Sequence, residues 1–339
     1  MKAYRLHAFS GPDGWKLEDL PSPTPGVGEV LIRVRAASIN YRDLLIANGI
    51  YNPKLKLPTI PVSDAAGEIV ACGPGTSRFQ VGDRVAANFM PGWIDGPVDD
   101  HKVRSALGGE ASGVLAEEVV APEAGLVRIS ERLSFEEAAT LPCAGVTAWH
   151  SLFHAGTVKP GATVLTLGTG GVSIFAVQFA SHAGARVIAT SSSDAKLSRV
   201  HQLGATHMIN YRTEPDWEDK VRELTDGVGV DVVVEVGGAG TFPKSLRAVR
   251  TGGTIALIGV LSGQGRIDPI SILMRSVKVQ GIYVGSTAMF KEMSRAIDVG
   301  GIKPVVDRVF PFADAPDALR HMASGSHFGK IVIRVCIEG

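Results

Sequence analysis

The clearest chemical signal in the sequence lies between Thr163 and Ser173, in the run TVLTLGTGGVS. Its opening TVLTL predicts a buried strand, and the apolar-periodic VSIFAVQFASHAG after the glycines predicts a helix. A glycine turn between a strand and a helix lets the backbone approach a pyrophosphate, which the helix N-terminus then binds. Ser173 replaces the third glycine of the usual G-x-G-x-x-G pattern, so the match is partial. The expected dinucleotide contacts are Gly168, Thr169, Gly170, Gly171 and Val172.

The type of dinucleotide depends on the end of the second strand, where an acidic residue binds the ribose 2′-hydroxyl of NAD. This chain has Thr190-Ser191-Ser192-Ser193 there, and we expect the next residue, Asp194, to begin a helix. Small hydroxyl side chains leave room for a 2′-phosphate, and Lys196 can add a charge-assisted hydrogen bond. We therefore predict NADP(H). The alternative is that these residues only cap the helix and face solvent.

Two later strands end in small residues, at Gly237-Gly238 and at Gly259-Val260-Leu261. In open α/β sheets ligands bind outside the carboxyl ends of the strands, so small residues there leave space for a nicotinamide. We expect both runs to contact the cofactor. The alternative is that each run is only a turn that ends a strand.

From about residue 134 the pattern alternates between strands and helices, which predicts a doubly wound parallel sheet. Ser134 and Glu137 form a predicted capping box at the start, and Pro142 is expected to divide the following helix. The predicted strands cover residues 163–167, 186–189, 207–210, 231–236, 254–258 and 278–284. Predicted helices after the glycine turn cover residues 194–203, 217–224 and 241–249.

Residues 1–130 are β-rich, with short strands separated by proline and glycine clusters, which predicts a small barrel-like antiparallel domain. The polar, glycine-rich stretch 91–113 predicts a long surface loop that could act as a lid. The predicted strands cover residues 3–6, 29–37, 66–72, 84–87 and 115–120. The end of the chain predicts helices over 290–298 and 315–322 and a closing strand over 330–335.

Composition narrows the class of protein. A length of 339 residues suggests two domains, and 34 basic against 34 acidic residues give no electrostatic reason to expect nucleic acid or an anionic membrane as partner. We expect neither a membrane span nor a signal peptide, because no sufficiently long apolar stretch occurs. The few, scattered cysteines fit a reducing cytoplasm, and we expect Cys72 and Cys336 in the core.

At this point the sequence resembles the medium-chain dehydrogenase/reductase superfamily over its whole length. The motifs are PGVGEVLIRVRAASIN, VGDRV, LPCAGVTAW, LGTGGVS and HFGKIVIRV. SINYRDLLIANGIY and PVSDAAGEIV resemble most the zinc-free alcohol dehydrogenase-like and quinone oxidoreductase branch. The resemblance implies an α/β protein with a GroES-like β-rich catalytic domain, residues 1–143 and 284–339. It implies a Rossmann NADP-binding domain with a six-stranded sheet over residues 144–283.

The resemblance also implies a function. It suggests an NADP-dependent reductase of small carbonyl, enone or quinone substrates, often a homodimer joined along the last strand of the sheet. Ser192, Lys196 and Tyr211 match the positions that bind the 2′-phosphate. Thr147 matches a threonine behind the nicotinamide, and Lys330 a basic residue that reaches the pyrophosphate. We add Tyr41 and Val284 to the expected cofactor contacts.

Zinc-dependent relatives carry their metal ligands at places that Asn40, Ser63-Asp64 and Cys143 occupy here. A catalytic zinc needs about three protein ligands, so we predict no metal. His150 and His154 have a spacing that can bind a metal. Because no third ligand accompanies them, we interpret them as packed or surface side chains.

Without zinc, hydrogen-bond donors must stabilise the negative charge that develops on a carbonyl oxygen. The catalytic candidates are Asn40 and Tyr51 as donors and Asp43 as an orienting acceptor. The alternative for Asn40 and Asp43 is a network that only caps the following helix. Zinc-free relatives often carry a tyrosine where this chain has Leu45, which argues against a tyrosine acid there. Alternative functions are an alcohol dehydrogenase with a recruited metal and a non-catalytic NADPH-binding protein of the zeta-crystallin type.

Overall fold

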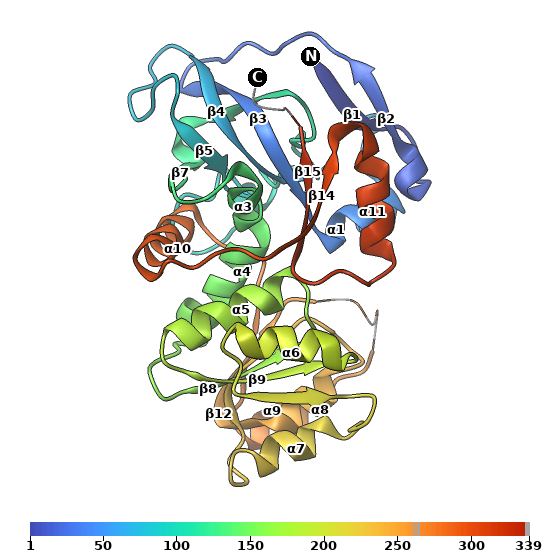
Figure 1. Cartoon of the computed structure of the whole chain (residues 1–339), viewed down its shortest axis with the longest axis vertical. Coiled ribbons are helices and arrows are strands. Elements are labelled where there is room, and N and C mark those ends of the chain that lie inside the picture. The colour runs from blue at the N-terminus through green and yellow to red at the C-terminus, as the bar shows by residue number, and fades with distance from the viewer. Residues whose placement is uncertain (260, 262, 264, 336–339) are drawn as a thin grey trace. The chain divides into compact units, whose positions relative to one another are not determined.

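The computed structural model describes residues 1–259, 261, 263 and 265–335 (Figure 1). These residues form two compact units, each with its own sheet. The first unit comprises Met1–Val146 and the described residues of Gly285–Gly339, and the second comprises Thr147–Val284. None of the described helices is both long enough and apolar enough to pass through a lipid bilayer.

The first unit is built around the long strand β3 (Glu29–Ile39). One edge of β3 pairs with β4 (Asp64–Cys72), and the other edge pairs with β6 at its start and with β15 at its end. The closing strand of the chain therefore belongs to the same sheet as the N-terminal strands. The order β14-β15-β3-β4-β5-β7 is antiparallel except for the pair of β14 and β15. The other bounds are β5 Arg84–Ala87, β6 Glu118–Pro122, β7 Leu126–Arg128, β14 Val306–Pro311 and β15 Lys330–Arg334; β1 Lys2–Leu6 and β2 Trp15–Asp19 form a separate ribbon.

Two helices cover one part of this sheet, α1 (Tyr41–Ala47) and α11 (Ala315–Ala323), and Figure 1 shows them beside β14 and β15. Their buried faces share an apolar cluster with the strands, which includes Ile46, Leu319 and Ile331. Burial of such side chains stabilises the fold by roughly 1.5–3 kcal/mol each. The remaining helices of this unit are α2 Asp100–Val103, α3 Phe135–Ala138 and α10 Thr287–Gly300.

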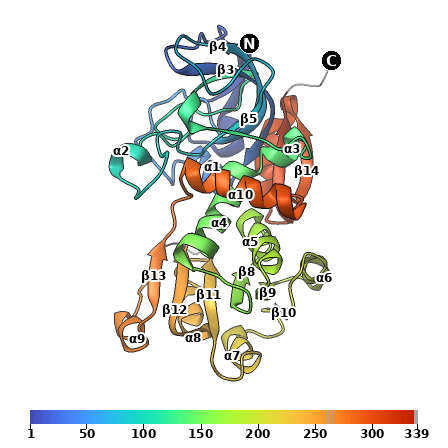
Figure 2. The same cartoon turned by 90° about the vertical axis from the view of Figure 1, so that its left-hand side faces the viewer.

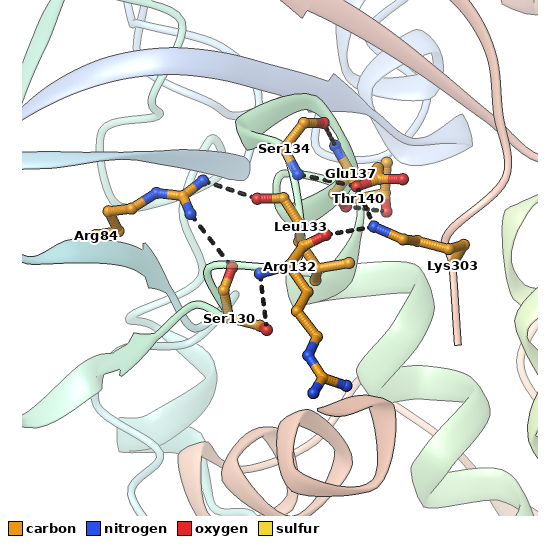
Figure 3. A network of polar contacts seen from close by, with 8 residues as sticks. All are labelled: Arg84, Ser130, Arg132, Leu133, Ser134, Glu137, Thr140 and Lys303. Carbon is orange, nitrogen blue, oxygen red and sulfur yellow. Dashed lines mark hydrogen bonds and ion pairs between the residues drawn. The ribbon is translucent and has the colours of Figure 1, made fainter. Parts of the chain in front are cut away.

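A polar network fixes the entry into α3 (Figure 3). Arg84 donates hydrogen bonds to the carbonyls of Ser130 (3.3 Å) and Leu133 (2.8 Å), and Lys303 donates to the carbonyl of Arg132. The predicted capping box is confirmed, because Ser134 Oγ accepts from the Glu137 N–H (3.1 Å) and Glu137 Oε2 accepts from the Ser134 N–H (2.8 Å).

Beyond α3 the chain continues as a series of short helical turns, and Pro142 lies inside the first of them. These turns are a π-helical turn over Leu141–Gly145, α4 Val146–Trp149 and a second π-helical turn over His150–Ala155.

In the second unit the described residues form a six-stranded parallel sheet in the order β10-β9-β8-β11-β12-β13, which can be followed across Figure 2. The predicted doubly wound sheet is confirmed, and its strand order reverses between β8 and β11. The strands are β8 Thr163–Leu167, β9 Arg186–Ser191, β10 His207–Asn210, β11 Val230–Glu235, β12 Val249–Leu257 and β13 Lys278–Gly281. The helices are α5 Gly171–His182, α6 Asp194–Gln202, α7 Trp217–Glu223, α8 Phe242–Ala248 and α9 Pro269–Met274.

Several predictions differ from the structure. β6 begins at Glu118 rather than Leu115, and the loop 91–113 contains α2 and buries Trp93, of which 2% is exposed. Cys72 is exposed because it is the last residue of β4, so its assignment to the core is wrong; Cys336 lies outside the described residues. The sequence did not reveal the short elements β2, β7, β14 and α9, whose patterns are too brief for periodicity to show.

Candidate active site

Asn40 and Lys330 meet because of the register between β3 and β15. Ile331 lies opposite Ile39, which brings the first residue of β15 beside the residue that follows β3. Lys330 is buried, with 4% of its surface exposed. Its ammonium donates hydrogen bonds to the carbonyl of Ile39 (2.8 Å) and to Oδ1 of Asn40 (2.5 Å).

Asp43 holds the start of α1. Its Oδ2 accepts the backbone N–H of Asn40 at 2.7 Å, so Asp43 acts as a capping acceptor, as the alternative interpretation of the sequence suggested. Burial raises the pKa of Asp43 from 3.8 to about 6, against the opposing effect of the neighbouring Arg42. Its second oxygen, Oδ1, is buried and has no hydrogen-bond partner among the described residues.

Asp64 joins this cluster from β4. Its Oδ1 accepts from the Ser63 hydroxyl (2.7 Å) and its Oδ2 from the backbone N–H of Cys143 (3.0 Å). Burial raises the pKa of Asp64, and the Lys330 ammonium and the hydrogen bond from Ser63 oppose that increase. The amide nitrogen of Asn40, Nδ2, is buried and has no hydrogen-bond partner within the described part of the chain. The Asn40 amide therefore has a donor, Lys330, at its oxygen, and the pairing of Ser38 with Asp64 brings an acceptor to the same end of β3 and β4.

The backbone just before Ser63 is strained. Val62 is buried and has φ 71°, a conformation that β-branched residues rarely adopt. Gly113 lies close against it, because a Cβ at residue 113 would be 2.4 Å from the Val62 carbonyl oxygen. The end of the loop 91–113 thus packs on the turn that presents Ser63 and Asp64. Strain of this kind often occurs at functional sites.

The positions that bind zinc in zinc-dependent relatives do not fit a catalytic zinc here. Both oxygens of Asp64 accept hydrogen bonds, and burial, followed by the charge of Asp64, raises the pKa of the Cys143 thiol. The Lys330 ammonium bonds Asn40 directly, and its charge would repel a dication. Within the described ranges, no group of three or more His, Cys, Asp or Glu side chains is placed to hold a metal.

The two tyrosines of this region are both 41% exposed. The ring of Tyr51 lies 5.3 Å from the guanidinium of Arg42, which also contacts the ring of Phe89 at 4.6 Å. Arg42 in turn donates to the carbonyl of Leu107 (2.7 Å). Tyr41 is the first residue of α1. Tyr51 therefore belongs to the surroundings of the cluster through its contact with Arg42.

In the second unit the glycine turn has the form that a pyrophosphate requires. Gly168 has φ 72° and donates to the Thr190 carbonyl (2.9 Å), and Gly170 precedes the 12-residue helix α5 without a side-chain cap. A Cβ at Gly168 or Gly170 would meet nothing within 4 Å, so the space beside both glycines is open. Ser173 turns its hydroxyl inward to the Leu167 carbonyl (2.7 Å), which explains how serine replaces the third glycine. These residues fit a dinucleotide.

The ends of β9 and β10 bring together the residues predicted for the 2′-phosphate. Ser191 ends β9, and its carbonyl accepts the Tyr211 N–H at 3.0 Å. Asp194 begins α6 as predicted, and its carboxylate accepts from the Asn210 amide (2.7 Å). Ser193 caps α6 by accepting the Lys196 N–H (3.4 Å). Ser192 lies between these two elements.

The ends of β11 and β12 are organised by a residue that sequence reasoning missed. Glu235 is fully buried, and its carboxylate accepts from the N–H groups of Gly237 (2.8 Å) and Gly238 (3.0 Å). The hydroxyls of Thr241 (2.6 Å) and Ser245 donate to the same carboxylate. An acidic residue at the end of a strand followed by two glycines is the signal that could have identified it.

The other predicted cofactor contacts lie in varied surroundings. A Cβ at Gly259 would be 1.5 Å from the Val236 carbonyl oxygen, so only glycine fits there. Val284 has φ 57°, and its carbonyl accepts from Nδ1 of His150 (2.7 Å), so His150 is a packed residue. Thr147 is buried, Thr169 is 7% exposed and Leu261 is 53% exposed, whereas Val260 lies outside the described residues.

Two family models match the chain. The alcohol dehydrogenase GroES-like domain matches residues 26–131, and the zinc-binding dehydrogenase model matches residues 171–298. A zinc-type alcohol dehydrogenase-like protein of Schizosaccharomyces pombe is 45% identical over 341 residues, which are 98% of this chain and 99% of the relative. The human quinone oxidoreductase is 29% identical over 342 residues, which are 98% of this chain and 97% of the relative.

Solved structures of other proteins also resemble this chain over nearly its whole length. The structure of an NAD-dependent alcohol dehydrogenase is 37% identical, with a TM-score of 0.91 and coverage of 99% of this chain and 100% of that one. A mycobacterial structure complexed with NADPH is 31% identical, with a TM-score of 0.84 and the same coverage. Because a relative that is 45% identical matches almost the entire length, the chain belongs to the medium-chain dehydrogenase/reductase superfamily of oxidoreductases, with a GroES-like domain and a Rossmann sheet.

Proposed function

We propose that this protein is a zinc-independent, NADPH-dependent oxidoreductase that acts on a carbonyl, enone or quinone substrate. The observation that carries the proposal is the contact between the Lys330 ammonium and Oδ1 of Asn40. It places an organic cation beside residues that stand at the metal-ligand positions of zinc-dependent relatives. The amide donors of Asn40 are free of regular hydrogen bonds within the described structure. They can therefore serve a carbonyl oxygen in place of a Lewis acid.

Each residue of the cluster has a role in this proposal. Asn40 donates a hydrogen bond to the substrate oxygen, and the Tyr51 hydroxyl is a second donor. Asp43 fixes the backbone of Asn40 through its N–H, so that the amide keeps its position during the reaction. The bound nicotinamide supplies the hydride.

Apart from Tyr41, which belongs to the first unit, the cofactor residues of this proposal lie in the second unit. We assign the pyrophosphate to Gly168, Thr169, Gly170, Gly171 and Val172, because the turn is open beside two of its glycines. Ser191, Ser192, Lys196 and Tyr211 bind the 2′-phosphate in this proposal. Thr147, Gly237, Gly259, Leu261 and Val284 are assigned to the nicotinamide half, and Tyr41 is a further contact. The NADPH-bound neighbour supports this preference, whereas the NAD-dependent neighbour argues for testing it directly.

We further propose that the GroES-like domain comprises residues 1–143 and 284–339, that the Rossmann domain comprises residues 144–283, and that two chains form a homodimer along β13. β13 is an edge strand, and the neighbouring α9 exposes Ile270, Leu273 and Met274 to 64–76%. Exposed apolar side chains of this kind are typical of interfaces. A cytoplasmic location stays a prediction from the cysteine usage.

The proposed function is tested by NADPH oxidation against a panel of quinones, enones and aldehydes, with NADH in parallel. We expect oxidation with at least one class and a higher kcat/KM with NADPH. An absence of turnover with the whole panel, despite tight NADPH binding, would favour the non-catalytic NADPH-binding alternative. Turnover that requires added metal would favour the alcohol dehydrogenase alternative.

A further inference from the structure

A carboxamide can satisfy two opposite neighbours at once. Its oxygen only accepts hydrogen bonds and its nitrogen only donates them, whereas an ammonium only donates and a carboxylate only accepts. Asn40 has the donor-only Lys330 on one side, and the register that pairs Ser38 with Asp64 brings the acceptor-only carboxylate to the same end of the two strands. The orientation of the Asn40 amide is therefore set by chemistry, because the opposite orientation would bring two donors together.

The charge on Lys330 needs an explanation beyond packing. The residues that follow it in β15, Ile331, Val332 and Ile333, are apolar and fully buried. A buried ammonium is unfavourable unless oxygen atoms surround it. Lys330 bonds two oxygens, and the charges of Asp64 and Asp43 act on the same cluster. The ammonium therefore belongs to the polar cluster and not to the apolar row of the strand.

We propose that Lys330 is a positioning residue: its ammonium holds Oδ1 of Asn40 and so directs the Nδ2 donors of that amide to the carbonyl oxygen of the substrate. The positive charge also polarises the amide and strengthens its N–H groups as donors. This inference rests on the proposed function. It departs from the expectation that Lys330 reaches the pyrophosphate, because both of its hydrogen bonds go to oxygens of the first unit.

The test compares wild type with Lys330→Met, Lys330→Arg, Asn40→Ala and the double variant Lys330→Met/Asn40→Ala. Single-turnover rates are measured at saturating NADPH with the best substrate of the panel, and the NADPH Kd is measured by fluorescence titration. We expect Lys330→Met to lower the rate roughly 10- to 100-fold, because a donor is weakened rather than removed. The NADPH Kd should stay nearly unchanged. In the double variant, Lys330→Met should lower the rate little further than Asn40→Ala alone does, because Lys330 acts through Asn40.

A matched control is Lys303→Met, which also removes an ammonium that donates to a backbone carbonyl in the same unit but lies outside the cluster. It should leave rate and Kd unchanged. A weaker NADPH Kd for Lys330→Met with an unchanged saturated rate would overturn the proposal and assign Lys330 to the phosphate. The proposal would also be overturned if the rate loss in the double variant equalled the product of the losses in Lys330→Met and Asn40→Ala.

A second readout needs no substrate. The side-chain amide signals of Asn40, identified by their loss in Asn40→Ala, are recorded by ¹H–¹⁵N NMR in the free protein. Lys330→Met should shift them and Lys303→Met should not; unshifted signals refute the contact. If Lys330→Met does not fold, Lys330→Arg must shift the same signals, because its planar group cannot reproduce the ammonium geometry. A wild type inactive on the whole panel would refute the proposed function, while the NMR result would still decide the contact.

Discussion

The ammonium of Lys330 lies 2.5 Å from Oδ1 of Asn40, although 290 positions of the chain separate the two residues. The pairing of β15 with β3 produces the contact, since Ile331 lies opposite Ile39. With its oxygen occupied, the Asn40 amide has only donors left to offer. This is the property that a developing oxyanion requires of its partner.

Replacing Asn40 by alanine should therefore lower the single-turnover rate of NADPH oxidation. Removing one donor to an oxyanion typically costs about 2.7–4 kcal/mol, and we expect the lower end because a water molecule can partly replace the donor. NADPH affinity should change little. Asn48→Ala is the matched control, because Asn48 lies at the other end of α1, where its amide donates to the Leu44 carbonyl (2.8 Å). A full single-turnover rate with only a lower Tm would make Asn40 a structural residue.

Lys196→Ala should weaken NADPH binding and leave NADH binding nearly unchanged. A hydrogen bond to a charged group contributes about 1.5–3 kcal/mol, and only NADPH carries the 2′-phosphate that would lose it. Titration of the variant and the wild type with both cofactors measures the difference. Equal affinity of the wild type for NADPH and NADH would contradict the assignment.

Gly170→Ala should fold normally and bind the cofactor poorly. Its φ of −78° and ψ of 180° suit alanine, and the added Cβ would meet no atom within 4 Å, so the free energy of unfolding should hardly change. The same Cβ would fill the space assigned to the pyrophosphate. Gly281→Ala is the control, because its Cβ position is equally open but lies on β13. Unchanged cofactor affinity in Gly170→Ala would show that the turn does not hold the phosphates.

Asp43 should make the protein less stable as the pH rises from about 4 to about 6. Its pKa is raised from 3.8 to about 6 by burial, and Arg42, Asp64 and Lys330 face it. In this window the folded chain keeps a proton that the unfolded chain has released, so stability falls as the pH increases. A difference of this size corresponds to at most about 3 kcal/mol.

Asp43→Asn removes that titration while Oδ1 of the new amide can still accept the Asn40 N–H. Urea unfolding of both proteins between pH 4 and pH 7 should show the variant gaining stability relative to wild type as the pH rises. A difference that does not change with pH, or that changes with the opposite sign, would refute the raised pKa. Asp99→Asn is the control: the Lys102 N–H lowers the pKa of Asp99, so this carboxyl titrates below the measured window and the difference between that variant and wild type should hardly change between pH 4 and pH 7.

The second unit was largely predictable, because strand and helix alternate there with clear periods. The strands Thr163–Leu167 and His207–Asn210 have their predicted bounds, and α6 begins at Asp194 as predicted. Short edge strands such as β2 (Trp15–Asp19) were not predictable, because polar side chains on an exposed ribbon follow no apolar alternation.

The polar cluster was only partly predictable. Asn40 and Asp43 are three positions apart, and local capping chemistry relates them. The partnership of Asn40 with Lys330 depends on strand register between the two ends of the chain, which no local pattern encodes. Glu235 was not predicted for a similar reason, because its hydrogen-bond donors come together only when the turn after β11 is folded.

The central claim is that hydride transfer proceeds without a metal. Its most direct test is the single-turnover rate of NADPH oxidation by protein dialysed against a chelator, with zinc content determined on the same sample. The account predicts the full rate in protein that holds much less than about one zinc per chain. The reason is that Asn40 stands where zinc-dependent relatives have a metal ligand, and the Lys330 ammonium bonds it. About one zinc per chain in the purified protein, lost together with the rate and restored with it on adding Zn²⁺, would contradict the account.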